Sequence, residues 1–535
     1  MCGIVAITGT DTVSGRLVDG LKRLEYRGYD SAGIATVNSG MLDRRRAVGK
    51  LVNLSDLLVH EPLAGKAGIG HTRWATHGEP NVKNAHPHRS GPVTVVHNGI
   101  IENFRPLREE LAAAGLGHET DTDTETVALL TRHHMDQGMD PQQAVGATLA
   151  RLEGAFALAF LFEGEEDLLI AARKGSPLAI GHGDGEMFVG SDAIALSPMT
   201  DRITYLEEGD RAVLTRNSLE IRDTTGALAN REVKTIQIDV GQVDKAGYKH
   251  YMAKEIAEQP TVIAEAIRHY LPVGEDTVRL PGENIDFSKI ERLTMVACGT
   301  AFYACLTAKY WFEQIARLPV EVDIASEFRY RAPVLPQSGP TLFVSQSGET
   351  ADTLAALRYC RQNGTPAVAV VNVPESSIAR EAAAIVPTHA GPEIGVASTK
   401  AFTAQLSVLA VLALNAAKAR GHLLPGDEAA AVKSLLALPR KVTEALEAQD
   451  DIREIAKTLV HCRDVLFLGR GRYYPLAMEG ALKLKEVSYI HAEGYAAGEL
   501  KHGPIALIEK DLPVVVVAPK DELFEKTISN VEEIR

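Results

Sequence analysis

The chain has 535 residues, of which 45% are hydrophobic and 24% charged, and its formal net charge is −14. This length exceeds what one hydrophobic core supports and predicts about three domains of ~100–200 residues each. The acidic balance argues against a nucleic-acid partner, because proteins that bind nucleic acid normally present a basic face.

Five cysteines are scattered along the chain without a CxxC pair, at Cys2, Cys298, Cys305, Cys360 and Cys462. An odd number in this arrangement disfavours both a disulfide framework and a zinc site. No apolar run approaches the ~20 residues of a membrane span, and the N-terminus lacks a charged segment followed by an apolar stretch. The sequence therefore predicts a cytoplasmic protein with no metal and no membrane partner.

From Met1 to about Leu214 the pattern alternates short β runs with amphipathic helices, which predicts layered α and β structure. Strands are expected at Ile4–Thr8, Val93–His97, Ala155–Phe162 and Met187–Ser191, and helices at Leu17–Leu24 and Phe104–Ala114. Residues 222–250 are polar and weakly periodic. We expect them to form a linker after a first domain at 2–221.

Cys2 becomes the N-terminus if Met1 is removed. Its own α-amino group, with a reference pKa of roughly 7.7–8.0, can then accept the thiol proton near neutral pH. An accidental terminal cysteine is the alternative, because the reactivity of a thiol depends on its surroundings. Four polar clusters accompany Cys2 at predicted strand ends or turns: HTRWATHG at 71–78, NAHPH at 84–88, HNG at 97–99 and DTDTE at 121–125.

These clusters resemble the glutamine amidotransferases of the N-terminal nucleophile class. MCGI, LEYRGYDSAG, HTRWATHG, NAHPH, HNGIIEN and TDTE are together most similar to the glutamine–fructose-6-phosphate aminotransferase family. The resemblance implies a layered αββα domain in which Cys2 attacks the side-chain amide of glutamine. It also implies that Asn98 and Gly99 stabilise the oxyanion and that the glutamine contacts come from Arg73, Trp74, Thr76, His86 and Asp123.

The chemistry of glutamine fits these residue types. Arg73 can hold the α-carboxylate with two parallel hydrogen bonds, Asp123 can accept the α-ammonium, and Trp74 resembles the residue that caps the pocket. Each also has a structural alternative: surface charges for Arg73 and Asp123, a hairpin turn for Asn98-Gly99, and a hydrogen-bonded core residue for His86. Their joint occurrence with Cys2 favours catalysis, because the roles interlock around one reaction.

From about Asn284 onward, apolar strands are each followed by a Gly-bearing turn and a helix, which predicts parallel, doubly wound sheets. A shift of 172 positions aligns 295–299 with 467–471, 325–327 with 497–499, and 342–344 with 514–516. The repeat predicts two related α/β domains, at 284–436 and 455–535.

The second copy stops at Arg535, whereas the first continues through Val396–Lys400 and a long Ala/Leu helix to about Leu436. Counterparts of residues 364–436 are therefore missing, and we expect a C-terminally truncated chain with an incomplete second sheet. A naturally short second copy is the alternative, although an unfinished parallel sheet exposes a strand edge.

SQSGET at 345–350 follows an apolar strand and opens a helix, so its N–H groups and hydroxyls can hold a phosphate without a lysine. A plain strand-to-helix turn is the alternative. The second copy carries VAPKDE at 517–522 in the equivalent place, where two carboxylates repel a phosphate. Phosphate binding is therefore predicted for the first copy.

SQSGET, ACGT at 297–300, VASTK at 396–400 and GRGRYYPLAMEGALKLKE from Gly469 resemble the sugar isomerase (SIS) halves of the same family. The resemblance implies that the phosphate of fructose 6-phosphate is held by Ser345, Gln346, Ser347 and Thr350. It further implies that the sugar site is lined by Thr300, Val396 and Ser398.

The resemblance also implies acid–base residues for the sugar. Glu486 is similar to the base that moves a proton between C2 and C1, Lys483 to its charged helper, and His502 to a ring-opening histidine reached from a neighbouring subunit, which requires a homodimer. On pattern alone, Glu479, Lys483 and Glu486 lie at i, i+4 and i+7 and read as a solvated salt-bridge face.

The sequence thus predicts conversion of glutamine and fructose 6-phosphate to glutamate and glucosamine 6-phosphate, with no metal or organic cofactor. An amidotransferase with another sugar-phosphate acceptor and a sugar-phosphate-binding regulator are the alternatives. The tail that supplies the family's Schiff-base lysine has no counterpart here, so we expect the glutaminase half alone to be chemically complete.

Overall fold

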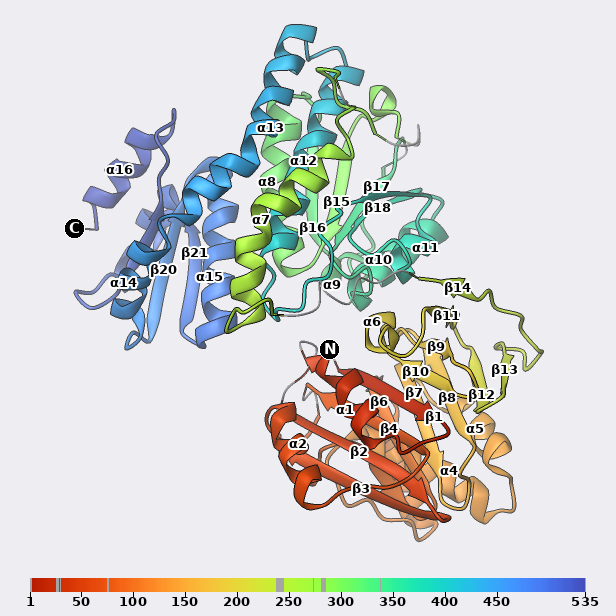
Figure 1. Ribbon diagram of the computed structural model, residues 1–535. Helices are drawn as coiled ribbons and strands as arrows, with labels where there is room; N and C mark the ends of the chain where they lie inside the picture. Colours follow the sequence, from red (N-terminus) through yellow and green to blue (C-terminus); the bar gives the residue numbers. More distant parts are fainter. Residues whose placement is uncertain are drawn as a thin grey trace. The chain divides into compact units, whose positions relative to one another are not determined.

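The computed structural model describes residues 2–25, 28, 30–74, 77–236, 245–272, 274–280, 285–336 and 338–534 (Figure 1). The chain divides into two compact units, Met1–Asp244 and Lys245–Arg535. Thr76, one of the predicted glutamine contacts, lies outside the described residues.

The first unit contains two sheets with antiparallel pairing. One has the strand order β14-β11-β9-β10-β1-β4-β2-β3 and the other β13-β12-β8-β7-β6-β5. Its strands are β1 (Gly3–Thr8), β2 (Ser31–Asn38), β3 (Met41–Val48), β4 (Ala67–Arg73), β5 (His88–Ser90), β6 (Val93–Ile101), β7 (Gly154–Phe162), β8 (Leu169–Lys174), β9 (Ala179–His182), β10 (Met187–Gly190), β11 (Arg202–Tyr205), β12 (Arg211–Thr215), β13 (Ser218–Arg222) and β14 (Lys234–Thr235). Its helices are α1 (Ser14–Lys22), α2 (Leu51–His60), α3 (Phe104–Ala113), α4 (Asp123–Asp136), α5 (Pro141–Leu149) and α6 (Ala193–Leu196).

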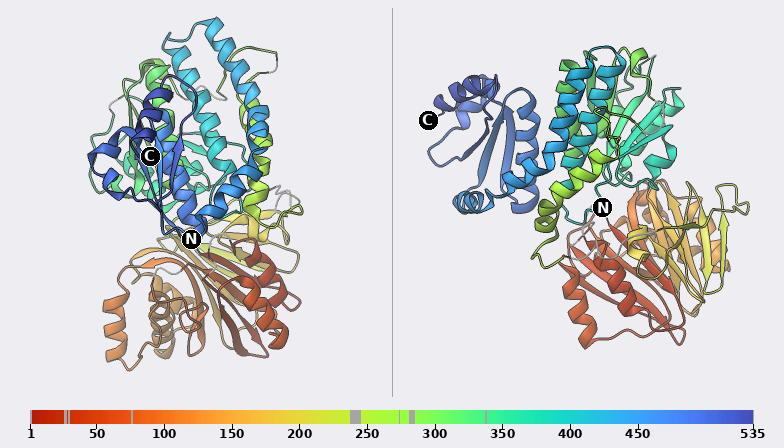
Figure 2. Two further views of the ribbon diagram at one scale, coloured as in Figure 1. Left: turned by 90° about the vertical axis from the view of Figure 1, so that its left-hand side faces the viewer. Right: turned by 45° about the horizontal axis from the view of Figure 1, so that its top comes forward.

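Side-chain alternation along the strands builds four layers. In β1, Ile4 and Ala6 pack between the two sheets, whereas Val5 and Ile7 pack on the other side with α1 and α2. The second sheet does the same, because Val95 of β6 packs with α3, α4 and α5 while its neighbour Val96 faces the other sheet. The result is the expected helix–sheet–sheet–helix sandwich (Figures 1 and 2).

Part of the segment expected to be a linker, 222–250, is folded. Lys234–Thr235 form β14 and pair with β11, where Ile203 lies opposite Lys234. A two-residue polar edge strand carries too little hydrophobic pattern to be recognised in the sequence. The described residues up to 236 therefore belong to the first unit.

The second unit begins with helix α7 (Tyr251–Arg268), which the sequence analysis did not assign. It contains a five-stranded parallel sheet with the order β16-β15-β17-β18-β19. The strands are β15 (Leu293–Ala297), β16 (Val320–Ile324), β17 (Thr341–Ser345), β18 (Ala367–Val371) and β19 (Ala384–Pro387). The other elements are η3 (Phe287–Lys289), α8 (Gly299–Gln314), α9 (Ala325–Phe328), α10 (Ala351–Gln362), α11 (Ser377–Glu381), α12 (Lys400–Ala419) and α13 (Pro425–Leu446).

Helices cover both faces of this sheet, as a doubly wound fold requires. One core joins α7, α8, α12 and α13 to one face, and the other joins α9, α10 and α11 to the opposite face. The long Ala/Leu helix expected up to Leu436 is two helices, because α12 ends at Ala419 and α13 starts at Pro425. Proline is well placed there, at the first position of a helix.

The chain continues through a smaller parallel sheet with the order β21-β20-β22. Its elements are α14 (Gln449–Leu459), β20 (Asp464–Gly469), η4 (Gly471–Tyr473), α15 (Tyr474–Ser488), β21 (His491–Ala496), η5 (Ala497–His502), η6 (Pro504–Leu507), β22 (Val514–Val517) and α16 (Phe524–Glu532). Shifting β15, β16 and β17 by 172 positions places them on β20, β21 and β22, and β15 lies between β16 and β17 as β20 lies between β21 and β22. The predicted duplication of an α/β unit is confirmed.

Helix α12 contradicts the expectation that no apolar run approaches the length of a membrane span. Among the described helices, it is long and apolar enough to cross a membrane by length and composition alone. However, 78% of its most apolar window is buried inside the protein. The apolar sequence of α12 is thus explained by its place in the core on the sheet of β15–β19.

Candidate active sites

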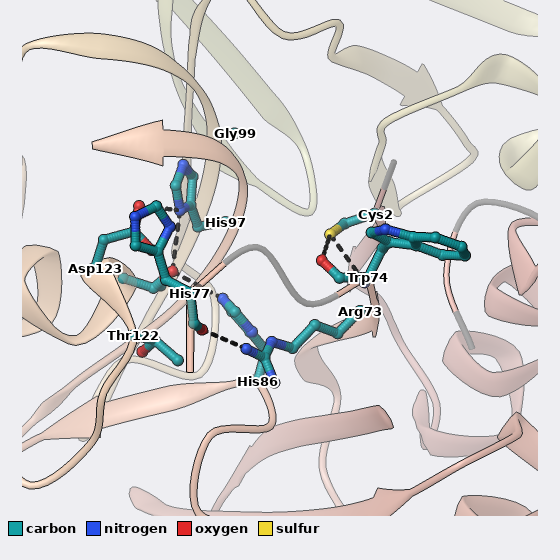
Figure 3. Close-up of a pocket in the computed structure, with 10 residues that line it drawn as sticks. Cys2, Arg73, Trp74, His77, His86, His97, Gly99, Thr122 and Asp123 are labelled. Carbon is teal, nitrogen blue, oxygen red and sulfur yellow. Dashed lines mark hydrogen bonds and ion pairs between the residues drawn. The ribbon is translucent and has the colours of Figure 1, made fainter. Parts of the chain in front are cut away.

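Cys2 lies directly before β1, at the end of the sheet where β4 terminates. Gly3 of β1 pairs with Thr72 of β4, so the thiol comes beside the residues that follow this strand. The backbone N–H of Trp74 donates to Cys2 Sγ at 3.3 Å, and Sγ lies 3.6 Å from the carbonyl oxygen of Trp74 (Figure 3). Burial raises the pKa of the Cys2 thiol, while the hydrogen bond to Trp74 opposes the rise. The thiol therefore needs a base before it can attack.

Two predicted oxyanion residues, Asn98 and Gly99, lie on β6 close to Cys2. The side-chain amide of Asn98 donates to the carbonyl oxygen of Cys2 at 3.0 Å, and its Oδ1 lies 3.1 Å from Nε2 of His71. Gly99 lines the same pocket as Cys2. The alternative of an ordinary hairpin turn fails, because both residues pair with β7 inside the strand.

Gly99 also has a conformation that its position requires. Its φ is +132°, and a Cβ there would lie 2.0 Å from the carbonyl oxygen of Ala155 on the neighbouring strand. Both the backbone angle and the close approach exclude a side chain.

We predict that Gly99→Ala lowers the free energy of unfolding by more than the ~1–3 kcal/mol of backbone strain alone. Gly115→Ala is the matched control, because Gly115 also has a positive φ of +85° but no atom within 4 Å of its Cβ position. Chemical denaturation of both variants measures the difference. Equal losses in the two variants would contradict steric exclusion at Gly99.

A pocket with an empty volume of about 260 Å³, open solvent included, surrounds these groups. Besides Gly99, five of the predicted site residues line this pocket. Asn98 is not among the lining residues, but it contacts Cys2. Four further lining residues were not predicted as site residues, although His97 belongs to the HNG cluster and two threonines to TDTE. The lining consists of Cys2, Arg73, Trp74, His77, His86, His97, Gly99, Thr122, Asp123 and Thr124 (Figure 3).

The two charged residues predicted to hold glutamine are buried, which rules out the surface-charge alternative. Arg73 is 3% exposed, and its guanidinium donates to the carbonyl oxygens of His77 at 2.5 Å and Gly78 at 2.9 Å. Asp123 is 4% exposed at the start of α4, and its Oδ2 accepts from the N–H of Ile101 at 2.8 Å. The pocket thus carries one fixed cation and one fixed anion, as an α-amino acid requires.

His86 belongs to a cluster of four buried histidines. Its ring stacks on His71 at a centroid distance of 4.1 Å and meets His88 edge-on at 4.6 Å, while Nε2 lies 2.9 Å from Oγ1 of Thr124. Burial lowers the pKa of all four, that of His71 to about 3, so the cluster is neutral at pH 7. The fourth member of the cluster is His97. His86 is therefore both a hydrogen-bonded core residue and part of the pocket wall.

In the second unit, the SQSGET loop links β17 to α10 and brings its hydroxyls together. Oγ of Ser345 accepts from the N–H of Gly348 at 3.0 Å and lies 3.2 Å from Oγ1 of Thr350. Oγ of Ser347 accepts from the N–H of Glu349 at 3.2 Å. Gln346 is tied through its backbone, because its carbonyl oxygen accepts from the N–H of Asn372 at 3.2 Å. The loop stands at the N-terminus of a twelve-residue helix, where an anion is favoured.

Thr300 on α8 contacts two charged residues of α15, one of which also pairs with a third. Its Oγ1 donates to Oε1 of Glu479 at 3.0 Å and accepts from Nζ of Lys483 at 3.0 Å. Lys483 also pairs with Oε2 of Glu486 at 2.5 Å. Burial raises the pKa of Glu479 to about 7, against the lowering effect of Lys483. Lys483 is therefore not part of a solvated face, and it lies between two carboxylates.

The remaining predicted sugar-site residues lie on other elements of the second unit. Ser398 and Val396 lie on the loop before α12, where Val396 is 50% exposed and Oγ of Ser398 donates to Glu393 at 2.8 Å. His502 ends η5 and is exposed. Within the part of the chain that the structure describes, no hydrogen bond or ion pair joins His502 to Lys483 or Glu486. The same part contains no group of three His, Cys, Asp or Glu side chains that could hold a metal ion.

Models of two known families match the parts of the chain that carry these residues. Residues 72–198 match the glutamine amidotransferase domain, and residues 286–415 and 458–533 match the SIS domain. The fold and the pocket at Cys2 therefore define a glutamine amidotransferase domain joined to two SIS domains.

Relatives over the full chain identify the family. The chain is 59% identical over all its residues to glutamine–fructose-6-phosphate aminotransferase (isomerizing) from Bradyrhizobium diazoefficiens, and 56% identical to that from Zymomonas mobilis, and it covers 88% of each. The solved C-terminal domain of glucosamine-fructose-6-phosphate aminotransferase from Francisella tularensis matches 54% of this chain and 82% of that one, with 46% identity and a TM-score of 0.53. The chain belongs to the glutamine–fructose-6-phosphate aminotransferase (isomerizing) family. Because this similarity extends over both units, the expectation that the chain is a glutaminase alone is not borne out.

Proposed function

We propose that this chain transfers the amide nitrogen of glutamine to fructose 6-phosphate, giving glutamate and glucosamine 6-phosphate. The observation that carries the proposal is the thiol of Cys2 beside a pocket that contains buried Arg73 and buried Asp123. Membership of the family, over both units of the chain, supports a sugar phosphate as the acceptor.

In the first half-reaction, Cys2 Sγ attacks the amide carbon of glutamine and its proton passes to the α-amino group of the same residue, once Met1 has been removed. The tetrahedral intermediate carries an oxyanion, for which the amide of Asn98 and the N–H of Gly99 are the proposed donors. The α-amino group then returns its proton to the leaving nitrogen, and collapse of the intermediate releases ammonia and leaves a thioester, which water hydrolyses to glutamate and the free thiol. The NH₂ group of Asn98 has two donors, of which one now donates to the carbonyl oxygen of Cys2.

Recognition of glutamine uses the two fixed charges. Arg73 is proposed to bind the α-carboxylate and Asp123 the α-ammonium, while Trp74, which is 44% exposed, caps the pocket. His86 acts as a neutral wall, because its pKa lies well below the ordinary value. Thr76 is proposed as a further contact from the family pattern alone.

In the second half-reaction, the phosphate of the sugar is proposed to bind the SQSGET loop through Ser345, Gln346, Ser347 and Thr350. These side chains supply hydroxyl and amide donors without a cation, as suits a helix N-terminus. Phosphate displaces the hydrogen bonds that the hydroxyls now make among themselves. Thr300, Val396 and Ser398 are proposed to line the sugar.

Proton transfer between C2 and C1 is assigned to Glu486. Its carboxylate forms an ion pair with Nζ of Lys483 at 2.5 Å. His502 is proposed to open the sugar ring from a neighbouring subunit, which is consistent with its exposure here and requires a homodimer. We place the reaction in the cytoplasm, with no cofactor and no nucleic-acid or membrane partner.

The test is a coupled assay with glutamine labelled by ¹⁵N in its amide, together with fructose 6-phosphate. We expect ¹⁵N-labelled glucosamine 6-phosphate and glutamate in equal amounts, measured by mass spectrometry. Glutamate without an amino sugar would replace the proposal with an amidotransferase for another acceptor. Tight sugar-phosphate binding with neither product would instead identify a regulator. A reaction without fructose 6-phosphate is the control for basal glutamine hydrolysis.

A further inference from the structure

The loop 393–400 connects the segment after β19 to the start of α12 and carries Val396 and Ser398. Val396 is apolar yet 50% exposed, so burial of its own side chain does not determine its position. The backbone on either side of it must therefore be held by other groups. Three buried charged residues hold it, Glu255 of α7 and the two end residues of the loop itself, Glu393 and Lys400, and each is at most 9% exposed.

Glu255 holds the first part of the loop from α7. Its Oε1 accepts from the N–H of Ile394 at 2.5 Å and from that of Gly395 at 2.9 Å, and its Oε2 lies 3.1 Å from the N–H of Gly395. Glu255 is 2% exposed. Hydrogen bonds from N–H groups to a buried carboxylate are roughly twice as strong as those between neutral groups.

The contact between Glu255 and Gly395 leaves no room for a side chain. A Cβ on Gly395 would lie 2.4 Å from Oε2 of Glu255. The φ of Gly395 is not positive, so a side chain here conflicts with the present position of the Glu255 carboxylate and not with the backbone angle. The fit indicates that the carboxylate and the loop backbone are matched to each other.

The second part of the loop is held by two further buried groups. Oε1 of Glu393 accepts from the N–H groups of Thr399 at 2.8 Å and Ala401 at 3.1 Å, which caps the start of α12. Nζ of Lys400 donates to Oε2 of Glu258 on α7 at 2.8 Å. Both ends of the loop are thus hydrogen-bonded to α7, and the backbone that carries Val396 lies between these two fixed points.

We propose that Glu255 is a positioning residue for the sugar-phosphate site, acting through the N–H groups of Ile394 and Gly395 on the loop that carries Val396 and Ser398. This inference rests on the proposed function of that site. A carboxylate accepts both N–H groups at once, whereas an amide in its place directs an NH₂ group at one of them. The loop then shifts, and a displacement of about 1 Å at a binding site can cost about 10²-fold in rate.

The test compares Glu255→Gln with Glu265→Gln. Glu265 is on the same helix but pairs at the surface with Arg268. For Glu255→Gln we expect faster hydrogen exchange of the amides in 393–401 and a dissociation constant for fructose 6-phosphate raised between about 10-fold and 100-fold. The KM for the sugar should rise likewise, while hydrolysis of glutamine without sugar stays at the wild-type rate. The Glu265→Gln chain should match the wild type in all four measurements.

Gly395→Ala is a second variant, because its Cβ displaces the carboxylate of Glu255 without removing it. It is expected to raise the same dissociation constant if Glu255→Gln does not fold. Unchanged exchange in 393–401, or faster exchange with unchanged affinity, overturns the inference. A wild-type chain that binds fructose 6-phosphate but makes no amino sugar overturns the proposed function instead, and the affinities of the variants still decide the role of Glu255. A wild-type chain that does not bind the sugar overturns both.

Discussion

Replacing Cys2 with alanine is expected to lower the rate of glutamine hydrolysis by roughly 10³–10⁶-fold, the loss found when a covalent nucleophile is removed. Cys2 supplies the single thiol among the residues that line the pocket. The hydroxyls of Thr122 and Thr124 are far weaker nucleophiles, and the histidines that contact them are poor bases because burial lowers the pKa of each. Glutamate release is measured with and without fructose 6-phosphate, after intact mass has established that Met1 is absent.

Cys462→Ala is the matched control, because Cys462 follows α14 in the second unit and its thiol donates to the carbonyl of Thr458. It should hydrolyse glutamine like the wild type. The Cys2→Ala chain should still bind fructose 6-phosphate with unchanged affinity, because the proposed sugar residues all belong to the second compact unit. Equal glutamine hydrolysis by the two variants would remove Cys2 from the mechanism.

The second large effect is expected for Glu486→Gln, which should slow glucosamine 6-phosphate formation by roughly 10²–10⁴-fold. An amide cannot accept the proton that moves between C2 and C1, and it no longer neutralises Nζ of Lys483 at 2.5 Å. Lys483 then has Glu479 as its remaining anionic partner in the cluster, at 3.4 Å. The charge of Glu486 is one of the causes that raise the pKa of Glu479, so its removal favours the ionised form of Glu479 beside Lys483.

The measurement is the rate of amino-sugar formation together with the rate of glutamine hydrolysis without sugar. The first should fall, and the second should stay unchanged. Glu444→Gln is the control, since Glu444 pairs with Lys441 on an exposed part of α13. If Glu486→Gln and Glu444→Gln form product at the same rate, another group is the base. A loss of glutamine hydrolysis in Glu486→Gln would indicate misfolding, which its unfolding temperature would reveal.

Much of the fold could be predicted because the elements carry strong local patterns. β1, β6, β7 and β10 lie where alternating or continuous apolar runs predicted them, and the 172-residue repeat predicted that β15–β17 and β20–β22 would share a topology. Weak local pattern accounts for the misses. β14 is two polar residues long. Helix α7 directly follows a polar stretch, which hides the apolar residues that it buries in the core.

The candidate glutamine pocket could be predicted for a different reason, because Cys2, Arg73 and Asp123 are carried by recognisable clusters. Their burial could not be predicted. Arg73 and Asp123 read equally well as surface charges until the pairing of β1 with β4 placed Arg73 beside Cys2 and a hydrogen bond from Ile101 of β6 placed Asp123. The four-histidine cluster likewise depends on stacking between residues from separate strands and turns.

By itself, the amino-acid sequence determined the order of the domains and the duplicated parallel sheets and predicted the nucleophile, because periodicity and local motifs are properties of neighbouring residues. Only the tertiary structure decided which partner each buried charged group contacts. Glu255 contacts Gly395 across 140 positions, and Thr300 contacts Lys483 across 183. Such pairs leave no local signal, since their energy comes from burying charged groups against partners that the folded chain alone brings within hydrogen-bonding distance.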